Sequence, residues 1–407
     1  MKQKRVLIVT QYYYPESFRI NELGKELVDR GYHVDALVGI PNYPEGKYYN
    51  GYGLFTKRKE KVNGVTIYRC FQFPRGRKAS NFRLSLNYLS YMICACMWIL
   101  FFFSFRKKYD AVIAFEPSPI TLIVPACLLG MIRGTRVLSW IQDIWPDSIT
   151  DRVSERLGKL ITPPLNAITE FVYKHSDKIL ISSKGMKELI CRNADYSDKI
   201  VYVPNWCDDF LNVKQSEKSK PEIPEGFVIM MAGNLVDAID PKALCKCAEL
   251  LKDYSEIHFA FVGGGSYKEH MEHMFKSHGL KNVYFYGRHP FEMMPLFYSK
   301  ADAMLLSLRP QETKHLDVTV PSRLQSYMSA GKPIYAMIGS GARGVIESSD
   351  CGFVVDSGDY KGLADVILNT YKNTALLKVK GRNARSAFES EFTLKKGTDH
   401  FEQLINE

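Results

Sequence analysis

Runs of consecutive apolar residues alternate with amphipathic stretches along the first half of the chain. A run that is apolar throughout is typical of a strand covered on both faces, as in a parallel sheet. The amphipathic stretch at residues 19–30 is followed by Gly31, a residue type favoured just after a helix. The predicted strands are Val6–Thr10, His33–Val38, Val65–Cys70, Ala111–Phe115, Val137–Ile141, Ile179–Ser182 and Ile200–Val203.

A second series of the same kind begins after a polar stretch at residues 214–225. Its predicted strands are Phe227–Ala232, His258–Val262, Val283–Tyr286, Ala303–Ser307, Pro333–Ala336 and Gly352–Val355. Strands that alternate with helices indicate parallel sheets with helices on both faces. The pattern therefore predicts an α/β protein with two doubly wound domains, divided near residue 205. Because such sheets bind ligands at the carboxyl ends of their strands, we expect the site in the cleft between the domains.

The segment Leu84–Phe105 carries no charged residue, and Arg83 and Arg106–Lys108 flank it. Its length would allow it to cross a bilayer. However, the strands predicted on either side of it should share one sheet, which a single crossing would divide between the two sides of a membrane. Two interpretations remain: a helix that covers the sheet, or a helix that lies in the membrane interface with its basic flanks on anionic headgroups.

The net positive charge of the chain comes from its first half. Residues 1–205 hold 30 Lys and Arg against 18 Asp and Glu, whereas residues 206–407 hold 24 against 26. Arg75, Arg77 and Lys78 lie just before the apolar segment and contribute to this excess. A basic half predicts an anionic partner, such as nucleic acid, an anionic membrane surface or a phosphorylated substrate. Because the sequence has no nucleic-acid recognition motif, nucleic acid is not the expected partner.

The cysteines and histidines predict neither disulfides nor a metal site. The nine cysteines include no C-x-x-C pair, which argues against a zinc ribbon and against a disulfide framework. His270 and His273 lie at helical spacing, but a solvated helix face explains them better than a metal does. The chain opens directly on a strand pattern without a signal peptide, and a reducing cytosol fits its free cysteines.

The loops after the predicted strands carry the candidate chemistry. The loop Gln11–Arg19 lacks the G-x-G-x-x-G of dinucleotide sites, so NAD and FAD are not expected. Gly233-Asn234 and Gly263–Gly265 are turns at which a backbone can approach a phosphate. Ser322 precedes a helix pattern at whose start Arg323 would bind a diphosphate, although an ordinary capped helix fits the same residues.

Several multi-residue motifs, in order along essentially the whole chain, resemble those of another group of proteins. They are Pro15-Glu16 with Arg19, Ile40–Lys47, Gln142–Asp147, Val203–Trp206, Gly287-Arg288 with Pro290, and Pro321–Ile334. In these motifs the chain resembles the bacterial family 4 retaining glycosyltransferases, and among them the branch that builds capsule, O-antigen and colanic-acid-type polysaccharides. The resemblance implies a GT-B fold of two Rossmann-like domains, residues 1–205 and 206–387, with a C-terminal helix (388–407) that packs back on the first. It also implies retaining sugar transfer without a metal or another cofactor.

The resemblance places a nucleotide-sugar donor, with UDP as the expected nucleotide, on the second domain. The family's two signature glutamates are absent, because Val318 and Ser326 stand at their positions. Gln325 or Ser326 would then contact the ribose, less strongly than a carboxylate, and Arg323 would be the cation on the diphosphate. The candidate donor-binding residues are Gly233, Asn234, Gly263, Gly264, Arg288, Ser322, Arg323, Gln325, Ser326 and Glu347.

The implied acceptor is a saccharide on a polyprenyl diphosphate, bound by the first domain at the cytoplasmic face of the bacterial inner membrane. Catalysis would rest on positioning and on stabilising the diphosphate charge, which is the candidate role of Arg323. Asp143 or Glu16 is the candidate carboxylate near the acceptor hydroxyl. Alternatively, Asp143 caps a helix and Glu16 pairs with Arg19 at the surface. The candidate acceptor-binding residues are Arg19, Asn42, Tyr43, Lys47, Gln142 and Trp145.

Two other functions fit the same pattern. A nucleotide-sugar 2-epimerase would have the same two-domain fold but would need no lipid-facing helix. The second is a non-catalytic, membrane-associated binding protein, which kept the fold but lost the two glutamates and with them the activity. Such a protein would bind a nucleotide-sugar without reaction, or would not bind it.

Overall fold

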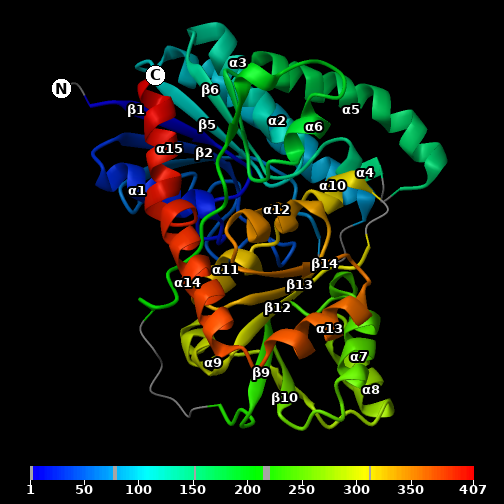
Figure 1. The fold of residues 1–407 in the computed structure, drawn as a ribbon. Helices are drawn as coiled ribbons and strands as arrows, with labels where there is room; N and C mark the ends of the chain where they lie inside the picture. The colour runs from blue at the N-terminus through cyan, green and yellow to red at the C-terminus, as the bar shows by residue number, and fades with distance from the viewer. Residues whose placement is uncertain (1–2, 77–79, 151–152, 214–220, 311–312) are drawn as a thin grey trace. The chain divides into compact units, whose positions relative to one another are not determined.

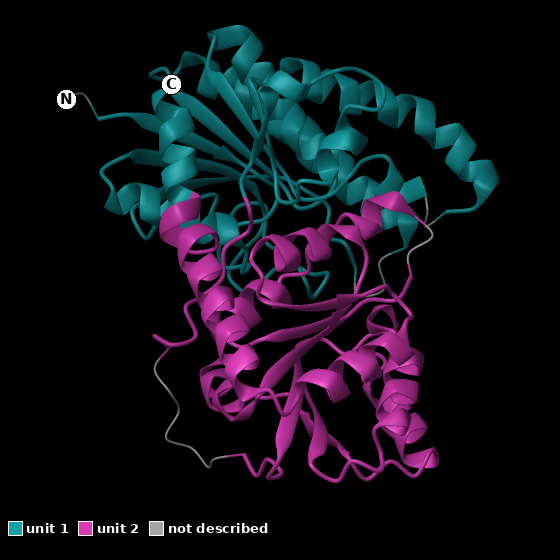
Figure 2. Ribbon diagram, in the orientation of Figure 1, with its two compact units in different colours: residues 1–203, 398–407 teal, residues 204–397 magenta. Residues whose placement is uncertain are grey.

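The structure, a computed structural model, describes residues 3–76, 80–150, 153–213, 221–310 and 313–407 (Figure 1). The chain divides into two compact units (Figure 2). Unit 1 comprises residues 1–203 and 398–407, and unit 2 comprises residues 204–397.

Unit 1 contains an eight-stranded sheet in the order β3-β4-β2-β1-β5-β6-β7-β8. All neighbouring strands pair in parallel except β3 and β4, which are antiparallel. The strands are β1 (Arg5–Val9), β2 (His33–Gly39), β3 (Lys59–Val62), β4 (Val65–Cys70), β5 (Ala111–Glu116), β6 (Arg136–Ile141), β7 (Lys178–Ile181) and β8 (Ile200–Tyr202). The apolar runs did not predict β3, because its sequence Lys-Glu-Lys-Val is mostly charged and half exposed, as is typical of a strand at a sheet edge.

The helices of unit 1 follow the strands in the expected alternation. They are α1 (Arg19–Asp29), α2 (Asn81–Phe101), α3 (Val124–Arg133), α4 (Asp147–Thr150), α5 (Glu155–His175), α6 (Met186–Ile190) and most of α15 (Leu394–Asn406). Strands β4 and β5, on either side of α2, belong to the same sheet, as the sequence predicts. Helix α2 buries Asn87, Tyr91, Ala95 and Ile99, which recur every fourth residue and form one narrow stripe.

Unit 2 contains a six-stranded parallel sheet in the order β11-β10-β9-β12-β13-β14. Its strands are β9 (Phe227–Ala232), β10 (Ile257–Val262), β11 (Val283–Gly287), β12 (Ala303–Ser307), β13 (Ile334–Met337) and β14 (Gly352–Val355). Its helices are α7 (Pro241–Leu250), α8 (Lys268–Ser277), α9 (Met294–Lys300), α10 (Lys314–Asp317), α11 (Arg323–Ser329), α12 (Ser340–Ser348), α13 (Tyr360–Thr370) and α14 (Thr374–Glu391). The two parallel α/β sheets confirm the predicted fold class.

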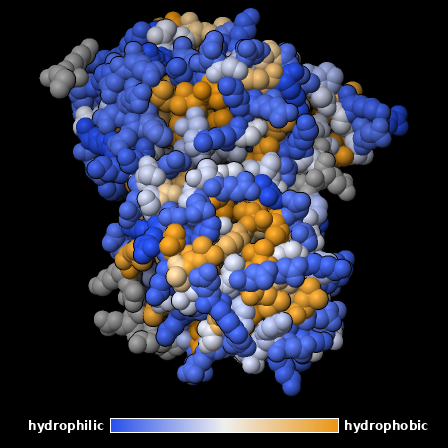
Figure 3. Space-filling model, viewed as in Figure 1, coloured by the Kyte–Doolittle hydropathy of each residue, from blue (hydrophilic) through white to orange (hydrophobic). Residues whose placement is uncertain are grey.

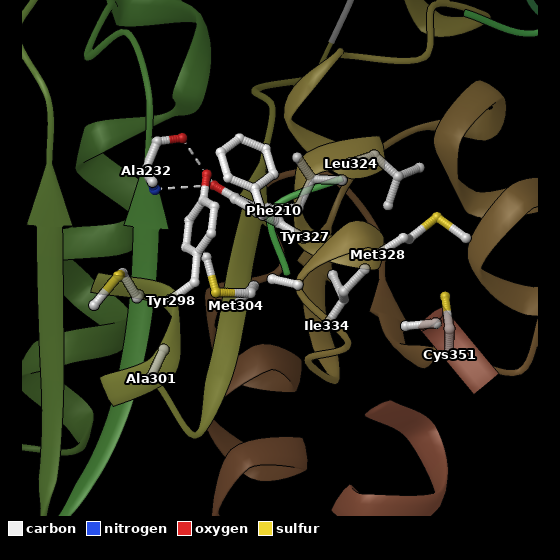
Figure 4. Close-up of a cluster of buried hydrophobic side chains, with 14 of the residues drawn as sticks. Phe210, Ala232, Tyr298, Ala301, Met304, Leu324, Tyr327, Met328, Ile334 and Cys351 are labelled. Carbon is white, nitrogen blue, oxygen red and sulfur yellow. Dashed lines mark hydrogen bonds between the residues drawn. The ribbon is translucent and has the colours of Figure 1, made fainter. Parts of the chain in front are cut away.

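One core of unit 2 fixes α11 against the sheet. Tyr327 on α11 is fully buried, and its hydroxyl donates to the Ala232 carbonyl (3.1 Å) and accepts from the Ala232 N–H (3.0 Å) at the end of β9 (Figure 4). Phe210, Tyr298 and Met328 pack in the same cluster. The hydrogen bonds give the buried phenol a partner and hold the start of α11 next to the loop that follows β9.

The C-terminal region contains a break that the sequence analysis did not predict. The single helix expected at residues 388–407 is wrong, because α14 ends at Glu391 and α15 begins at Leu394. Within unit 1, Phe401 of α15 packs on Trp140 with ring centroids 5.1 Å apart. Arg30 pairs with Asp399 at 2.6 Å and with Glu402 at 2.8 Å, so α15 is attached to α1 by charge as well as by apolar contact.

Candidate functional site

A pocket of about 710 Å³ lies in unit 2 at the carboxyl ends of β9, β10 and β11. Its position is the one at which parallel α/β sheets bind ligands. The pocket is lined by Phe210, Ala232, Gly233, Asn234, Val262, Gly263, Gly264, Gly265, Arg288, His289, Phe291, Met294, Tyr298, Ser322, Arg323 and Ser326.

Glycines form the floor of this pocket because the strand-end loops approach one another closely. Gly263 has φ +149°, and a Cβ there would overlap the Gly233 carbonyl. Gly265 has φ +156°, and a Cβ there would overlap the Leu235 carbonyl. The loops are joined by hydrogen bonds from the Gly233 N–H to Val262 O (2.9 Å) and from the Leu235 N–H to Gly264 O (2.8 Å). Only glycine fits this packing, which leaves the backbone open to a ligand.

The charges around the pocket favour an anion. Arg323 donates through Nη2 to the Asn234 carbonyl (3.0 Å), while its buried Nη1 has no hydrogen-bond partner among the described residues. Arg288 supplies a second guanidinium. No Asp or Glu is among the described residues that line the pocket. An unneutralised arginine with a spare buried donor is suited to a phosphate or carboxylate.

Eight of the ten predicted donor residues line the pocket: Gly233, Asn234, Gly263, Gly264, Arg288, Ser322, Arg323 and Ser326. The side-chain cap suggested for Ser322 is wrong, because Ser322 is itself in the right-handed helical region and its side chain caps nothing.

Two predicted donor residues do not line the pocket. Gln325 is buried, and its amide, in the orientation that satisfies its partners, donates to the Ser322 (3.0 Å) and Pro321 (3.2 Å) carbonyls. Glu347 on α12 is exposed and pairs with Arg343 at 3.3 Å. Val318, at the position of a signature glutamate, follows Asp317, whose carboxylate accepts hydrogen bonds from the N–H and hydroxyl of Ser340.

The apolar and aromatic wall of the pocket was not predicted from the sequence. His289, Phe291, Met294 and Tyr298 come from the segment after β11, and Phe210 comes from the chain that enters unit 2. His289 and Met294 lie in or beside the motif at Gly287–Pro290, but it is the fold that brings Phe210 and Tyr298 to the same wall.

In unit 1, the loops after β1 and β2 are joined through Glu16. This side chain is only 2% exposed, so the alternative that placed Glu16 at the surface is wrong. Glu16 Oε1 accepts from the backbone N–H groups of Asn42 (2.7 Å) and Tyr43 (2.6 Å). Burial raises the pKa of Glu16 to about 7, against the lowering effect of those two N–H groups. The structure therefore brings three predicted residues together around a carboxyl group that titrates near neutrality.

Asp143 lies in a different loop, after β6. Its Oδ1 accepts from the Ile144 N–H (3.1 Å) and from the Ser148 hydroxyl, four residues before α4 begins, so it is not an N-cap. The neighbouring Trp145 is buried and donates from Nε1 to the Ser118 hydroxyl (3.2 Å). Burial, together with the charge of Asp143, raises the pKa of Glu116 at the end of β5 well above its usual range.

The remaining predicted acceptor residues occupy less enclosed places. Gln142 is half-buried, with its backbone N–H bound to Glu116 O (3.0 Å). Arg19 is the first residue of α1, and Lys47 is exposed. Among the described residues, no group of three or more His, Cys, Asp or Glu is placed to hold a metal ion.

Comparisons with known proteins identify the class to which this fold and pocket belong. Residues 17–206 match the family model described as glycosyl transferase 4-like domain, and residues 213–387 match the one described as glycosyl transferases group 1. Sucrose-phosphate synthase from Thermosynechococcus elongatus superposes with a TM-score of 0.69 at 14% identity, covering 99% of this chain and 98% of that one. HepE of Anabaena, solved with UDP, superposes with a TM-score of 0.68 at 13% identity, covering 99% and 100%. The protein is a glycosyltransferase of GT-B type.

Within that class the chain belongs to the family 4 glycosyltransferases, as its motifs predict. It is similar to WcaI of Escherichia coli K12, a protein named as a glycosyl transferase of colanic acid biosynthesis. The two are 22% identical over 341 residues, which cover 80% of this chain and 81% of WcaI.

Proposed function

We propose that this protein transfers a sugar, with retention of configuration, from a UDP-sugar to a saccharide on a polyprenyl diphosphate in bacterial surface polysaccharide synthesis. The observation that carries the proposal is the unit 2 pocket, where Arg323 Nη1 is buried without a partner beside glycine loops that leave backbone open. A nucleoside diphosphate supplies the anion that this guanidinium lacks. The similarity to WcaI supports the place in polysaccharide synthesis.

The UDP part of the proposal is supported by the pocket walls and by a fold neighbour. Phe291, His289 and Arg288 offer flat faces against which a base can stack. HepE, which shares the fold, was solved in complex with UDP. Ser326 lines the pocket where the family has a glutamate, so its hydroxyl is the proposed ribose contact. Gln325 is turned into the start of α11 and has no part in this proposal.

The acceptor part of the proposal rests on α2. Together with the following turn, α2 is the only helix among the described residues that is long and apolar enough to cross a membrane. Its buried stripe holds it against the sheet, and Leu89, Ile93, Met97 and Phe101 are exposed on another face. Exposed apolar residues also occur in both units on the face shown in Figure 3, so exposure alone does not set α2 apart, whereas its length and apolar composition do.

We propose that this row lies in the cytoplasmic interface of the inner membrane rather than crossing the bilayer. A crossing would require the sheet that contains β4 and β5 to lie on both sides of the membrane. Lys107 and Lys108 at one end and Arg83 at the other are exposed and suited to anionic headgroups. Arg77 and Lys78, which the sequence analysis added to this charge, lie outside the described residues.

The proposed chemistry needs no protein nucleophile, metal or other cofactor. Arg323 stabilises the departing diphosphate, and the acceptor hydroxyl attacks from the same face of the sugar. Glu16 is the stronger candidate for the carboxylate near that hydroxyl, because its pKa near 7 lets it accept a proton at neutral pH. Asp143 is the second candidate, and its Oδ1 accepts from the Ile144 N–H and the Ser148 hydroxyl.

The test is transfer of labelled sugar from a panel of UDP- and GDP-sugars to lipid extracted from a bacterium that makes such polysaccharides. We expect label in the lipid fraction from one UDP-sugar, absent with Arg323→Ala, and an anomeric configuration that matches the donor. Interconversion of free UDP-sugars without transfer would instead indicate an epimerase. Tight nucleotide-sugar binding with neither reaction would indicate a protein that binds without catalysis.

A further inference from the structure

Arg75, in the loop after β4, is held by aromatic side chains rather than by an acid. Its Nη2 donates to the Tyr88 hydroxyl at 2.6 Å. Its guanidinium carbon lies 5.6 Å from the ring centroid of Tyr12, 5.3 Å from that of Tyr43 and 5.5 Å from that of Tyr88. The backbone N–H of Arg75 donates to Asn42 Oδ1 at 3.2 Å, which attaches the same loop to the candidate acceptor residues.

This arrangement fixes the guanidinium without neutralising it. Arg75 forms no ion pair with a described Asp or Glu, and its buried Nε has no hydrogen-bond partner among the residues that the structure describes. A guanidinium has five N–H donors, and tyrosine faces attract its charge without using those donors. A pre-oriented arginine with unused donors is suited to a phosphate, which it binds through two parallel hydrogen bonds.

Arg83 adds a second guanidinium at the same place. Its Nη1 lies 2.6 Å from the position that a Cβ on Gly76 would occupy, so Arg83 extends over the residue that follows Arg75. Arg83 is in the first turn of α2 and is exposed. Two neighbouring arginines fit a diphosphate better than a single phosphate.

The first turns of α2 lie at the carboxyl edge of the unit 1 sheet. Gln11, two residues after β1, donates from Nε2 to Asn87 Oδ1 (2.7 Å) and to Gln72 Oε1 (2.6 Å). From this edge the exposed row Leu89, Ile93, Met97 and Phe101 extends along the helix for roughly 18 Å, at 1.5 Å per residue. The arginines thus lie between the hydrogen-bonded loops of Glu16 and the beginning of an apolar row.

We infer that Arg75, with Arg83, binds the diphosphate of an isoprenoid-diphosphate acceptor, whose lipid chain follows the exposed row of α2 and whose sugar lies at the exposed ring of Tyr43. The inference rests on the proposed function for the presence of the sugar. It assigns Arg75 to the substrate and not to membrane headgroups, because the tyrosines hold the guanidinium at the sugar end of α2. Lys107 and Lys108, at the far end of α2, have the role of headgroup contacts.

The experiment is calorimetric titration of the full-length protein with farnesyl diphosphate below its micelle concentration, alongside farnesyl monophosphate, farnesol and inorganic diphosphate. We expect farnesyl diphosphate to bind most tightly. Arg75→Ala should weaken it about tenfold to hundredfold, as expected for the loss of charge-assisted hydrogen bonds. Arg75→Lys should restore only part of the affinity, because a lysine cannot form the paired contact.

Two controls keep the result interpretable. Lys107→Ala, an exposed cation at the other end of α2, should leave farnesyl diphosphate binding unchanged. If Arg75→Ala fails to fold, Tyr88→Phe removes only the hydroxyl that orients the guanidinium and should weaken binding about threefold to tenfold. Circular dichroism and thermal unfolding of the full-length protein report whether each variant is folded.

Three outcomes would overturn the inference. The first is an Arg75→Ala variant that binds farnesyl diphosphate as the wild type does. The second is an equal loss of binding to phosphatidylglycerol vesicles in Arg75→Ala and Lys107→Ala without a change toward farnesyl diphosphate, which would make Arg75 a headgroup contact. The third is displacement of farnesyl diphosphate by UDP together with its loss in Arg323→Ala, which would place the diphosphate in the donor pocket.

Failure of the inference and failure of the proposed function give different results. If Arg75→Ala transfers sugar with an unchanged KM for the lipid acceptor, the inference fails and the transferase stands. If the wild type binds farnesyl diphosphate through Arg75 but transfers no sugar, the proposed function fails and the diphosphate site stands.

Discussion

The candidate site of unit 2 presents glycine backbone to a ligand between side-chain walls, whereas the loops of the candidate site of unit 1 are joined through polar and aromatic side chains. In unit 2, glycine loops at the ends of β9 and β10 form an open pocket around a guanidinium with a buried spare donor. In unit 1, Glu16, Asn42, Tyr43 and Arg75 are joined by hydrogen bonds and ring contacts into a network. Open glycine backbone is suited to binding a group that many substrates share, such as a diphosphate. A side-chain network is easier to vary and suits a variable acceptor.

The largest expected effect is on the backbone site. Gly263→Ala would place a methyl group on the Gly233 carbonyl at a φ that side chains rarely adopt, so we expect a loss of about 3 kcal/mol in the free energy of unfolding of unit 2. UDP binding should fall with it. Gly344→Ala, on α12 in open space, is the matched control and should be nearly neutral. Denaturant titration measures both. Equal stability of the two variants would mean that the loops are not held as described.

Arg323→Ala tests the charge in the same pocket. The variant keeps the fold but loses the charge-assisted hydrogen bonds to a diphosphate, and we expect UDP affinity to fall by about 1.5–3 kcal/mol, or tenfold to hundredfold. Arg343→Ala removes an arginine from the same unit outside the pocket and should leave the affinity unchanged. Isothermal titration calorimetry with UDP gives both values. If the Arg343 variant is the weaker one, the binding site lies elsewhere in unit 2.

Ile93→Asn tests the exposed row of α2. This side chain is 56% exposed, and its burial in a membrane interface is worth about 2 kcal/mol, so binding to anionic vesicles should fall about thirtyfold. Leu250→Asn changes a comparably exposed residue on α7 in unit 2 and should leave vesicle binding intact. Vesicle sedimentation provides the measurement. If Ile93→Asn binds vesicles as the wild type does, α2 only packs against the sheet and does not contact the membrane.

Glu16→Gln tests the smaller effect of a buried carboxyl group. Because the folded pKa of Glu16, about 7, lies above its value in the unfolded chain, its protonated form is favoured by folding and stability is lost as pH rises through 7. From pH 6 to pH 8 we expect the wild type to lose about 1.4 kcal/mol more than Glu16→Gln, which can still accept both N–H bonds. Denaturation curves at the two pH values measure the difference. A wild type and variant with parallel pH profiles would contradict the raised pKa.

The strands could be predicted because a continuous apolar run is typical of a strand that is buried on both faces of a sheet. Every predicted strand is present within about one residue of its bounds, while β3 was missed because its exposed charged residues give no such signal. The break between α14 and α15 was missed because the helix at residues 388–407 was expected from the family resemblance, which does not show that a helix ends before Phe392.

The donor site was easier to predict than the acceptor site. Gly233 and Gly263 directly follow predicted strands, and Arg323 lies in the motif Pro321–Ile334. The sequence near each residue therefore indicates its place at the pocket. The burial of Glu16 and the cluster of Tyr12, Tyr43, Tyr88 and Arg75 depend on contacts between loops far apart in sequence. A single sequence does not show which tyrosines face one arginine. Gln325 shows the same limit, since its neighbours in the motif face the pocket and it does not.

The most direct test of the account is a crystal structure of the protein with UDP bound. We predict that the diphosphate lies at the glycine loops after β9 and β10, within hydrogen-bond distance of Arg323 Nη1. UDP bound outside the unit 2 pocket, or bound within it with Arg323 Nη1 still unpaired, would contradict the central claim.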